Sequence, residues 1–194
     1  MRQLDQDLQQ YKAGATDYES FARELLIHWA AGLKGKLYET VLGQAKRFID
    51  GEKNNFFPFL LQATALLGDI YDIYFITGEP QFVAESVTQK FQGNDYISSE
   101  FKVDRNDRFT GRIESFLATR EEKKNATGSL LAEYDMSDSF AFGDTEGDVE
   151  ILESVEHPIC VNPTPGLSEI AKQKNWMIAK PEEVADVIRQ KLTE

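Results

Sequence analysis

The chain lacks most of the chemistry that marks secreted, membrane-spanning or zinc-binding proteins. Of its 194 residues, one is cysteine and two are histidine, which excludes an internal disulfide and a thiolate metal cluster. No apolar run reaches the length of a membrane span, and the N-terminus has no signal-peptide core. Basic residues are few, 21 against 33 acidic ones, so the formal net charge is −12. This balance argues against nucleic acid or an anionic membrane as the main partner. We expect a cytoplasmic protein.

The residues that are present fit an ordinary folded domain. Hydrophobic residues make up 41% of the chain and aromatic residues 11%, enough to form a core and too many for a disordered chain. Helical spacing of apolar residues predicts helices through the first fifty residues, with no strand signal. Beyond them, strands alternate with helices. We therefore expect a helical cap segment at residues 1–55 and an α/β core at residues 56–194.

The core pattern predicts a three-layer sandwich with a mostly parallel, Rossmann-like sheet. The expected strands are Ile70–Ile76, Tyr96–Ile97, Ser139–Phe142, Pro158–Val161 and Trp176–Ile178, with a hairpin formed by Phe101–Val103 and Phe109–Ile113. The expected helices of this part begin near Phe59, Pro80, Glu121, Val149, Leu167 and Glu182.

One acidic stretch stands out at the end of a predicted strand. Asp144 follows Gly143 directly, and Asp148 falls where the next helix begins. The carboxyl edge of a parallel sheet is where α/β proteins bind ligands, and two carboxylates there suit Mg²⁺, which leaves room for a substrate phosphate. The alternative is a loop with acidic helix caps, because aspartate is common at helix starts.

Two further positions could bind an anion. Thr77-Gly78 lies between a strand and a helix, where a hydroxyl and the following amides can point at the same ligand; an ordinary capping threonine is the alternative. Lys123 and Lys124 begin a helix, where a positive charge opposes the helix dipole. A bound phosphate would explain that conflict, whereas a solvated charge on a mixed Glu-Glu-Lys-Lys run is the simpler interpretation.

Taken in order, these pieces resemble motifs two, three and four of the haloacid dehalogenase superfamily of phosphohydrolases: Thr77 after a strand, a lysine before the next helix, and Gly143 to Asp148. The similarity is to the phosphoserine phosphatase branch, and it covers roughly Asp17 to Ile178. His157-Pro158 and Val161-Asn162-Pro163, around the last long strand, also match. The fourth motif with its flanks is the specific part of the resemblance.

The resemblance implies roles for the individual residues. Asp144 would bind Mg²⁺ directly and Asp148 directly or through water. Thr77 and Gly78 would bind the phosphoryl group of a small phosphorylated metabolite, and the motif-three lysine would offset its charge. We prefer Lys123 to Lys124 for that lysine, because counting from Lys123 places the next apolar residues on one inward face.

One part of the family pattern is missing. The nucleophile and the acid/base of the family are two aspartates, one residue apart, at the end of a hydrophobic first strand that lies between the strands ending at Thr77 and Gly143. Asp5 and Asp7 have this spacing but follow only Met1-Arg2-Gln3-Leu4, which cannot form a buried strand, and we assign them to a solvated helix face. We therefore expect that this sequence lacks about one strand and part of one helix at its N-terminus, as a misplaced start codon at Met1 would cause. Each backbone group left unpaired would cost about 1–3 kcal/mol.

The sequence thus predicts a Mg²⁺-dependent phosphomonoester phosphatase acting through an aspartyl-phosphate, with the nucleophile strand absent from this chain and its activity therefore in question. A catalytically silent protein that binds a phosphorylated ligand or a partner is the alternative from another class, and a transferase is a third. We interpret His28 as a packing residue, His157 as a turn residue and Cys160 as a small core hydrophobe.

Overall fold

The computed structural model describes residues 8–51 and 59–193. Asp5 and Asp7 lie outside these ranges, so their expected place on a helix stays a prediction; residues 8–12 are helical. The helices that follow are α2 (Tyr18–Leu33), α3 (Tyr38–Gly51), α4 (Phe59–Leu67), α5 (Gln81–Lys90), α6 (Arg120–Glu133), α7 (Val149–Glu153), α8 (Pro165–Lys174) and α9 (Val184–Lys191), with a 3₁₀ turn η1 (Glu146–Asp148). The strands are β1 (Tyr74–Pro80), β2 (Asp95–Val103), β3 (Phe109–Ser115), β4 (Phe140–Gly143), β5 (His157–Val161) and β6 (Met177–Ala179).

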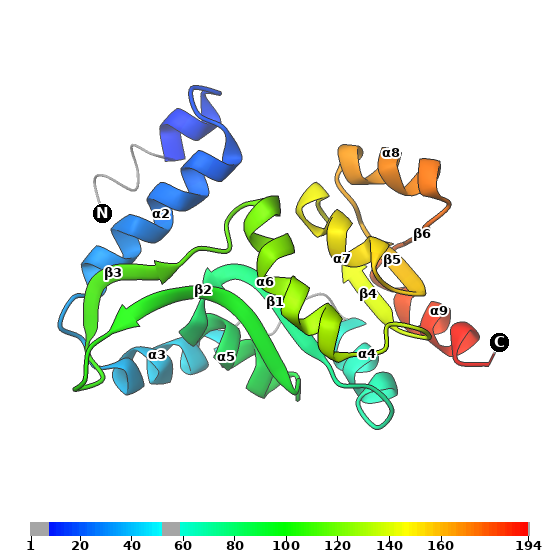
Figure 1. The fold of residues 1–194 in the computed structure, drawn as a ribbon, viewed down its shortest axis with the longest axis horizontal. Helices are drawn as coiled ribbons and strands as arrows, with labels where there is room; N and C mark the ends of the chain where they lie inside the picture. The colour runs from blue at the N-terminus through cyan, green and yellow to red at the C-terminus, as the bar shows by residue number, and fades with distance from the viewer. Residues whose placement is uncertain (1–7, 52–58, 194) are drawn as a thin grey trace.

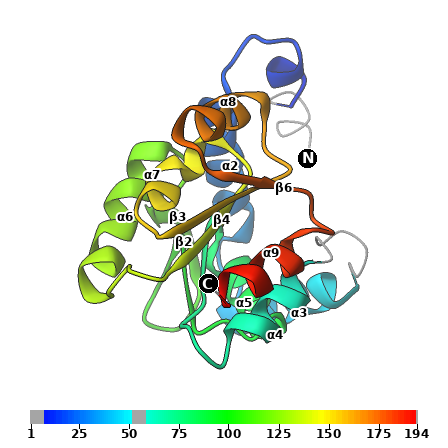
Figure 2. The ribbon, with the colours of Figure 1, turned by 90° about the vertical axis from the view of Figure 1, so that its right-hand side faces the viewer.

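The elements form three layers, with strands between two layers of helices (Figure 1). Helices α3, α5, α4 and α9 lie on one side of the strands, and α2, α6, α7 and α8 lie on the other. In the perpendicular view, β6 runs between α8 and α9 (Figure 2). The predicted α/β sandwich with a mostly parallel sheet is confirmed.

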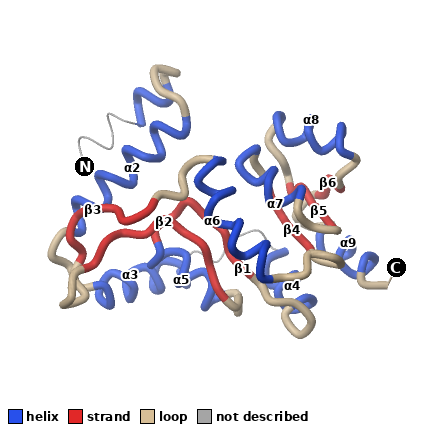
Figure 3. The backbone as a smooth tube through the Cα atoms, in the orientation of Figure 1, coloured by secondary structure: helices blue, strands red, loops and turns tan. Residues whose placement is uncertain are grey.

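The strands form two separate sheets (Figure 3). The first has the order β1-β2-β3, with β1 and β2 parallel and β2 and β3 an antiparallel hairpin; the second has the order β4-β5-β6, all parallel. Strand β1 is therefore an edge of one sheet and β4 an edge of the other. Within the described residues, no strand lies between these two edges.

The N-terminal helices pack on the first sheet. Helix α2 contacts β3 and α3 contacts α5, and their apolar faces meet the aromatic side chains of Phe82, Phe101 and Phe109 in one buried cluster. The side chain of Asp17 accepts a hydrogen bond from the Ser20 backbone N–H and caps α2. The expected cap helices thus share a core with the β2–β3 hairpin, and the domain boundary at residue 55 stays a prediction.

Two strand predictions were wrong in their bounds. The strand expected at Ile70–Ile76 begins at Tyr74, because the N–H groups of Ile70 and Tyr71 bond the Leu67 carbonyl and complete the last turn of α4. The short strand expected at Tyr96–Ile97 is the first part of β2, which continues without a break into the hairpin. In both places the residue types favour strands, but hydrogen bonds to distant or preceding residues set the ends.

The second sheet has its own buried core. Leu152 of α7, Cys160 of β5 and Leu167 of α8 are each fully buried there, which confirms Cys160 as a core residue. Burial, with a smaller contribution from the negative charge of Asp148, raises the pKa of the Cys160 thiol to about 11. None of the helices in the described ranges is both long and apolar enough to cross a membrane.

Leucine-to-alanine substitutions at a buried and an exposed position should lower the free energy of unfolding by different amounts. Leu152 is fully buried, whereas Leu61 on α4 is 62% exposed. We expect Leu152→Ala to lower the free energy of unfolding by about 2–5 kcal/mol and Leu61→Ala by less than about 0.5 kcal/mol, both measured by urea denaturation. Equal losses at the two positions would contradict the packing of α7 against β4 and β5.

Candidate functional site

The centre of the site is an ion pair between the start of α6 and the loop after β4. Lys123 Nζ donates a hydrogen bond to Asp148 Oδ1 over 2.9 Å. Both side chains are largely buried, Lys123 at 21% exposed and Asp148 at 16%. Helix α6 begins with a capping box in which Thr119 Oγ1 accepts from the Glu122 N–H and Glu122 Oε2 accepts from the Thr119 N–H. This cap fixes the first turn of α6 and so directs Lys123 toward the loop.

The second oxygen of Asp148 organises the loop itself. Asp148 Oδ2 accepts hydrogen bonds from the backbone N–H groups of Asp144 (3.1 Å) and Thr145 (3.2 Å) and from the Thr145 hydroxyl (3.2 Å). Asp148 ends the 3₁₀ turn and precedes α7 directly. With both oxygens held by donors, Asp148 is a fixed anchor of this loop.

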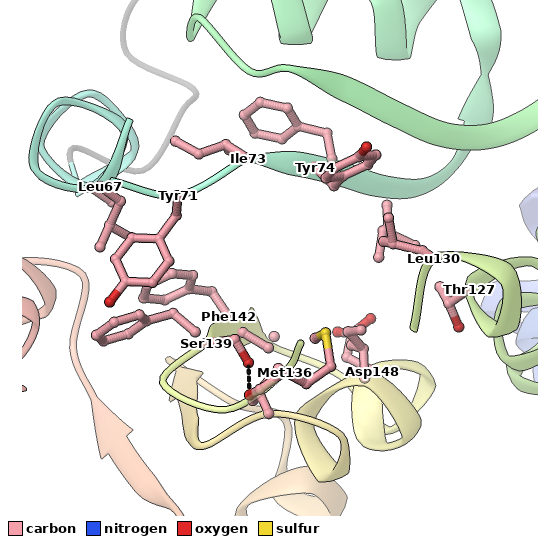
Figure 4. A pocket seen from close by; sticks show the side chains of 18 of the residues that line it. Leu67, Tyr71, Ile73, Tyr74, Thr127, Leu130, Met136, Ser139, Phe142 and Asp148 are labelled. Carbon is pink, nitrogen blue, oxygen red and sulfur yellow. Dashed lines mark hydrogen bonds between the residues drawn. The ribbon is translucent and has the colours of Figure 1, made fainter. Parts of the chain in front are cut away.

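Asp144 directly follows β4, and within residues 8–51 and 59–193 no other residue donates a hydrogen bond to its carboxylate. It lines the cavity between β1 and β4 together with Lys123 and Asp148 (Figure 4 labels Asp148). Partial burial raises the pKa of the Asp144 carboxyl, the negative charge of Asp148 raises it further, and the Lys123 ammonium opposes part of the increase. Asp144 is thus a solvent-accessible carboxylate that a nearby cation would stabilise.

Lys124 points elsewhere. Its ammonium lies 3.3 Å from Glu150 Oε2, its side chain is 62% exposed, and Arg120 also donates to Glu150, over 2.7 Å. Of the two lysines, Lys123 is the one directed at the acidic loop, and Lys124 belongs to a solvated network between α6 and α7.

Thr77 and Gly78 lie on β1 and directly follow Ile76, the last residue of that strand that lines the cavity. Thr77 Oγ1 accepts a hydrogen bond from the Glu79 N–H over 3.2 Å and makes none with Lys123, Asp144 or Asp148. The backbone at Gly78 approaches the β3–α6 connection closely, since a Cβ there would lie 3.0 Å from the Leu117 carbonyl oxygen. The structure therefore brings Lys123, Asp144 and Asp148 together, and leaves Thr77 across the gap between the sheets.

Two threonines support the site without having been singled out in the sequence. Thr145 binds Asp148, as described above, and Thr164 donates its N–H to the Asp144 carbonyl (2.8 Å) and its hydroxyl to Glu146 Oε2 (2.8 Å). The Thr145-x-x-Asp148 spacing is a capping-box pattern that the sequence does contain. The role of Thr164 depends on β5 lying beside β4, which no local pattern indicates.

The donor set fits Mg²⁺. This ion takes one or two protein carboxylates and keeps several positions for water and substrate phosphate. Asp144 offers a carboxylate that forms no ion pair with any described residue, and it lies beside the anchored Asp148. Across residues 8–51 and 59–193, no group of three or more His, Cys, Asp or Glu side chains is arranged to hold a metal. The described residues thus supply a two-carboxylate site at most.

Comparison with known proteins places the chain among hydrolases of one family. The family model of haloacid dehalogenase-like hydrolases matches residues 4–153. A histidinol-phosphatase from Neisseria meningitidis serogroup C (strain 8013) is 23% identical over 173 residues, which cover 87% of this chain and 77% of the relative.

Solved structures share the fold. A protein of unknown function from Bordetella pertussis Tohama I superposes with a TM-score of 0.74 at 23% identity, over 93% of this chain and 82% of its own. A probable phosphoserine phosphatase from Vibrio cholerae superposes with a TM-score of 0.64 at 17% identity, over 97% of this chain. The match spans 57% of the Vibrio chain, little more than half its length.

A glycine-to-alanine pair should test the close packing of the acidic loop. A Cβ at Gly143 would lie 2.6 Å from Asp148 Cβ, whereas one at Gly128 in α6 would meet nothing within 4 Å. We expect Gly143→Ala to lower the free energy of unfolding by about 1–3 kcal/mol, because Asp148 must move. Gly128→Ala should raise it by about 0.5–1 kcal/mol. Chemical denaturation measures both, and a Gly143→Ala protein as stable as the parent would show that Asp148 does not pack against β4.

Proposed function

The chain belongs to the haloacid dehalogenase-like hydrolase family, and we propose that it carries the metal- and phosphate-binding half of a phosphomonoester phosphatase site. The observation that carries this proposal is the buried Lys123–Asp148 pair beside the open carboxylate of Asp144 at the carboxyl end of β4. A cation and two acids in one cavity wall suit a ligand that combines Mg²⁺ with a phosphate.

Each residue has a distinct role in this proposal. Asp144 binds Mg²⁺ directly, and Asp148 contributes through water or after a small rearrangement, because its oxygens already accept hydrogen bonds. Lys123 offsets the negative charge of the phosphate while keeping Asp148 in place. Thr77 and the Gly78 N–H donate to a phosphoryl oxygen from the β1 side. Bound Mg²⁺ supplies positive charge where negative charge develops during phosphoryl transfer.

The attacking group is the part of the reaction that these residues do not supply. In the proposed chemistry a carboxylate attacks phosphorus, the bond from phosphorus to the ester oxygen breaks and the protonated alcohol leaves, and water then hydrolyses the aspartyl-phosphate to inorganic phosphate and the free carboxylate. Asp72 and Asp135 also line the cavity, but they precede β1 and β4 and so lie at the opposite end of these strands from Asp144. Asp5 and Asp7 lie outside the described residues. The gap between the sheets therefore favours, as a second candidate, a protein that binds a phosphorylated ligand without turnover.

The names of two relatives support a proposal for the substrate class. The Neisseria relative is named a histidinol-phosphatase and the Vibrio structure a probable phosphoserine phosphatase. Both names describe phosphatases of small phosphorylated metabolites, and we propose a ligand of that class for this chain. The cytoplasmic location stays a prediction.

Calorimetric titration with MgCl₂ and then inorganic phosphate should separate the roles of the acids. We expect Asp144→Asn to weaken Mg²⁺ binding by at least about tenfold (~1.4 kcal/mol), because the site loses its open carboxylate. The matched control is Asp186→Asn on α9, whose side chain is 85% exposed and whose loss should leave Mg²⁺ binding unchanged. Equal binding by both variants would contradict the assignment of Asp144.

The adjacent lysines allow a second comparison in the same titration. Lys123→Gln should weaken Mg²⁺-dependent phosphate binding by about tenfold or more, since a hydrogen bond to a charged group contributes about 1.5–3 kcal/mol. Lys124→Gln should bind phosphate like the parent, because Lys124 pairs with Glu150. If Lys124→Gln weakened phosphate binding and Lys123→Gln did not, the phosphate contact would belong to Lys124.

The purified 194-residue chain should release no phosphate from p-nitrophenyl phosphate above the rate without protein, with or without Mg²⁺. The reason is that Asp72 and Asp135, which also line the cavity, precede β1 and β4 and so lie at the opposite end of these strands from Asp144. Binding without turnover would favour the second candidate function. Mg²⁺-dependent phosphate release that Asp144→Asn abolishes would contradict this expectation and show that the site is complete.

A further inference from the structure

Lys123 stands at the start of a helix that buries few of its own side chains. Of the fourteen residues of α6, all of them described, only Thr127 is buried. Even so, the Lys123 ammonium reaches Asp148 in the loop after β4 over 2.9 Å. Because a helix is held in place mainly by the side chains that it packs, the direction of α6 depends strongly on the residues that precede and cap it.

Glu122, the neighbour of Lys123, holds this helix start through both oxygens of its carboxylate. Oε2 accepts hydrogen bonds from the backbone N–H groups of Ala118 and Thr119, each over 2.9 Å. Oε1 accepts a hydrogen bond from Nη2 of Arg23, a residue of α2. Partial burial would raise the pKa of the Glu122 carboxyl, but these hydrogen bonds outweigh it and lower that pKa below its ordinary value. The first turn of α6 is therefore bonded to a charged group of an N-terminal helix.

Arg23 contacts the connection between β3 and α6 a second time. Its guanidinium lies over the Phe116 ring, with Cζ 4.2 Å from the ring centroid, an arrangement that a cation and an aromatic face favour. Phe116 and Ala118 pack against the buried cluster that includes Leu26 and Ala30 of α2. Since these two residues follow Arg23 by three and seven positions, all three share one face of α2. This face packs on the chain that leads from β3 into α6 (Figure 1).

The same connection has a separate anchor on the first sheet. The Leu117 N–H donates to Ser99 Oγ over 2.9 Å, and that hydroxyl donates to the Gly78 carbonyl over 2.8 Å. Leu117 and Ser99 are both buried, and Arg23 takes no part in this link. Leu117 is thus held by β1 and β2, while the turn that follows it is held from α2 through Glu122.

We propose that Arg23 is a positioning residue of the phosphate site, which acts through Glu122 to keep Lys123 directed at Asp148. Its importance for phosphate rests on the proposed function, whereas its effect on Lys123 exists without any ligand. The docking of α2 and the direction of the phosphate lysine are then linked. The alternative is an ion pair that only stabilises the fold, since the Arg23 side chain is 39% exposed and such pairs contribute little.

Acetylation of Lys123 by N-hydroxysuccinimidyl acetate tests the proposal without a ligand. The Lys123 side chain is 21% exposed and paired with Asp148, so it should react slowly in the parent. We expect Arg23→Gln to raise the rate at Lys123 by about threefold or more, measured by tandem mass spectrometry. The rate at Lys102, which pairs with Glu114 on the β2–β3 hairpin, should stay as in the parent.

The matched control is Arg189→Gln. Arg189 forms an ion pair with Asp186 within α9, over 2.7 Å, and its side chain is also partly exposed. Both variants therefore lose one arginine of a partly exposed ion pair and should lower the free energy of unfolding by similar, small amounts. Only Arg23→Gln should change the acetylation rate at Lys123.

Phosphate titration then connects the position of Lys123 to the site. In the presence of MgCl₂, Arg23→Gln should weaken phosphate binding about threefold or more when Lys123 is present, and less than about twofold in the Lys123→Gln background. A residue that acts through Lys123 has no effect once Lys123 is removed. A parent protein that binds no phosphate would contradict the proposed function, and the acetylation rates would still decide the role of Arg23.

The proposal fails on any of three results. An unchanged acetylation rate at Lys123 in Arg23→Gln would assign the direction of α6 to its ion pairs with Glu150 of α7. Rates that rise equally at Lys123 and Lys102 would indicate a general loosening of the fold. Phosphate binding that weakens equally with and without Lys123 would show that Arg23 acts by another route.

Discussion

The carboxylate of Asp148 holds the functional end of this protein together. One oxygen binds Lys123 at the start of α6 and the other binds the backbone that follows β4. A lysine in the first turn of a helix opposes the helix dipole, and the buried ion pair with Asp148 compensates that conflict. The same contact positions Asp144, because the N–H of Asp144 is one of the donors. The site is therefore built around an anchor residue, with Asp144 as its open carboxylate.

The gap between the two sheets is the second constraint. Strands β1 and β4 face each other as edges, yet helices α4 and α6 cover the space between them on both faces, and Tyr71 contacts Phe140 at one end of it. Helix packing and aromatic contacts thus hold the two halves in the relation of neighbours in one sheet. The same gap separates Thr77 from Lys123 and Asp144. The residues of the proposed phosphate site are therefore divided between the two sheets.

The sequence predicted most elements because their patterns are local. Proline and threonine near helix starts, an apolar run before Gly143 and the polar turn of the hairpin each gave an element of the right type. The errors lie where distant residues decide. Ile70 belongs to the turn after α4 because Leu67 accepts its N–H, and β2 is long because β1 and β3 pair along different parts of it. The Thr119-x-x-Glu122 spacing is a local capping-box pattern that marks the start of α6 in the sequence itself.

By itself, the sequence determined the fold class, the family resemblance and the residue types of the site, because apolar periodicity and short motifs depend only on neighbours along the chain. Tertiary structure decided which of two adjacent lysines faces the acidic loop, since that depends on how α6 is rotated against β4. It also decided that Asp148 is an anchor and that Thr164 supports Asp144, because these contacts join segments that only folding brings together. The cavity between β1 and β4 belongs to this second group, because these two strand edges face each other only once both sheets have formed.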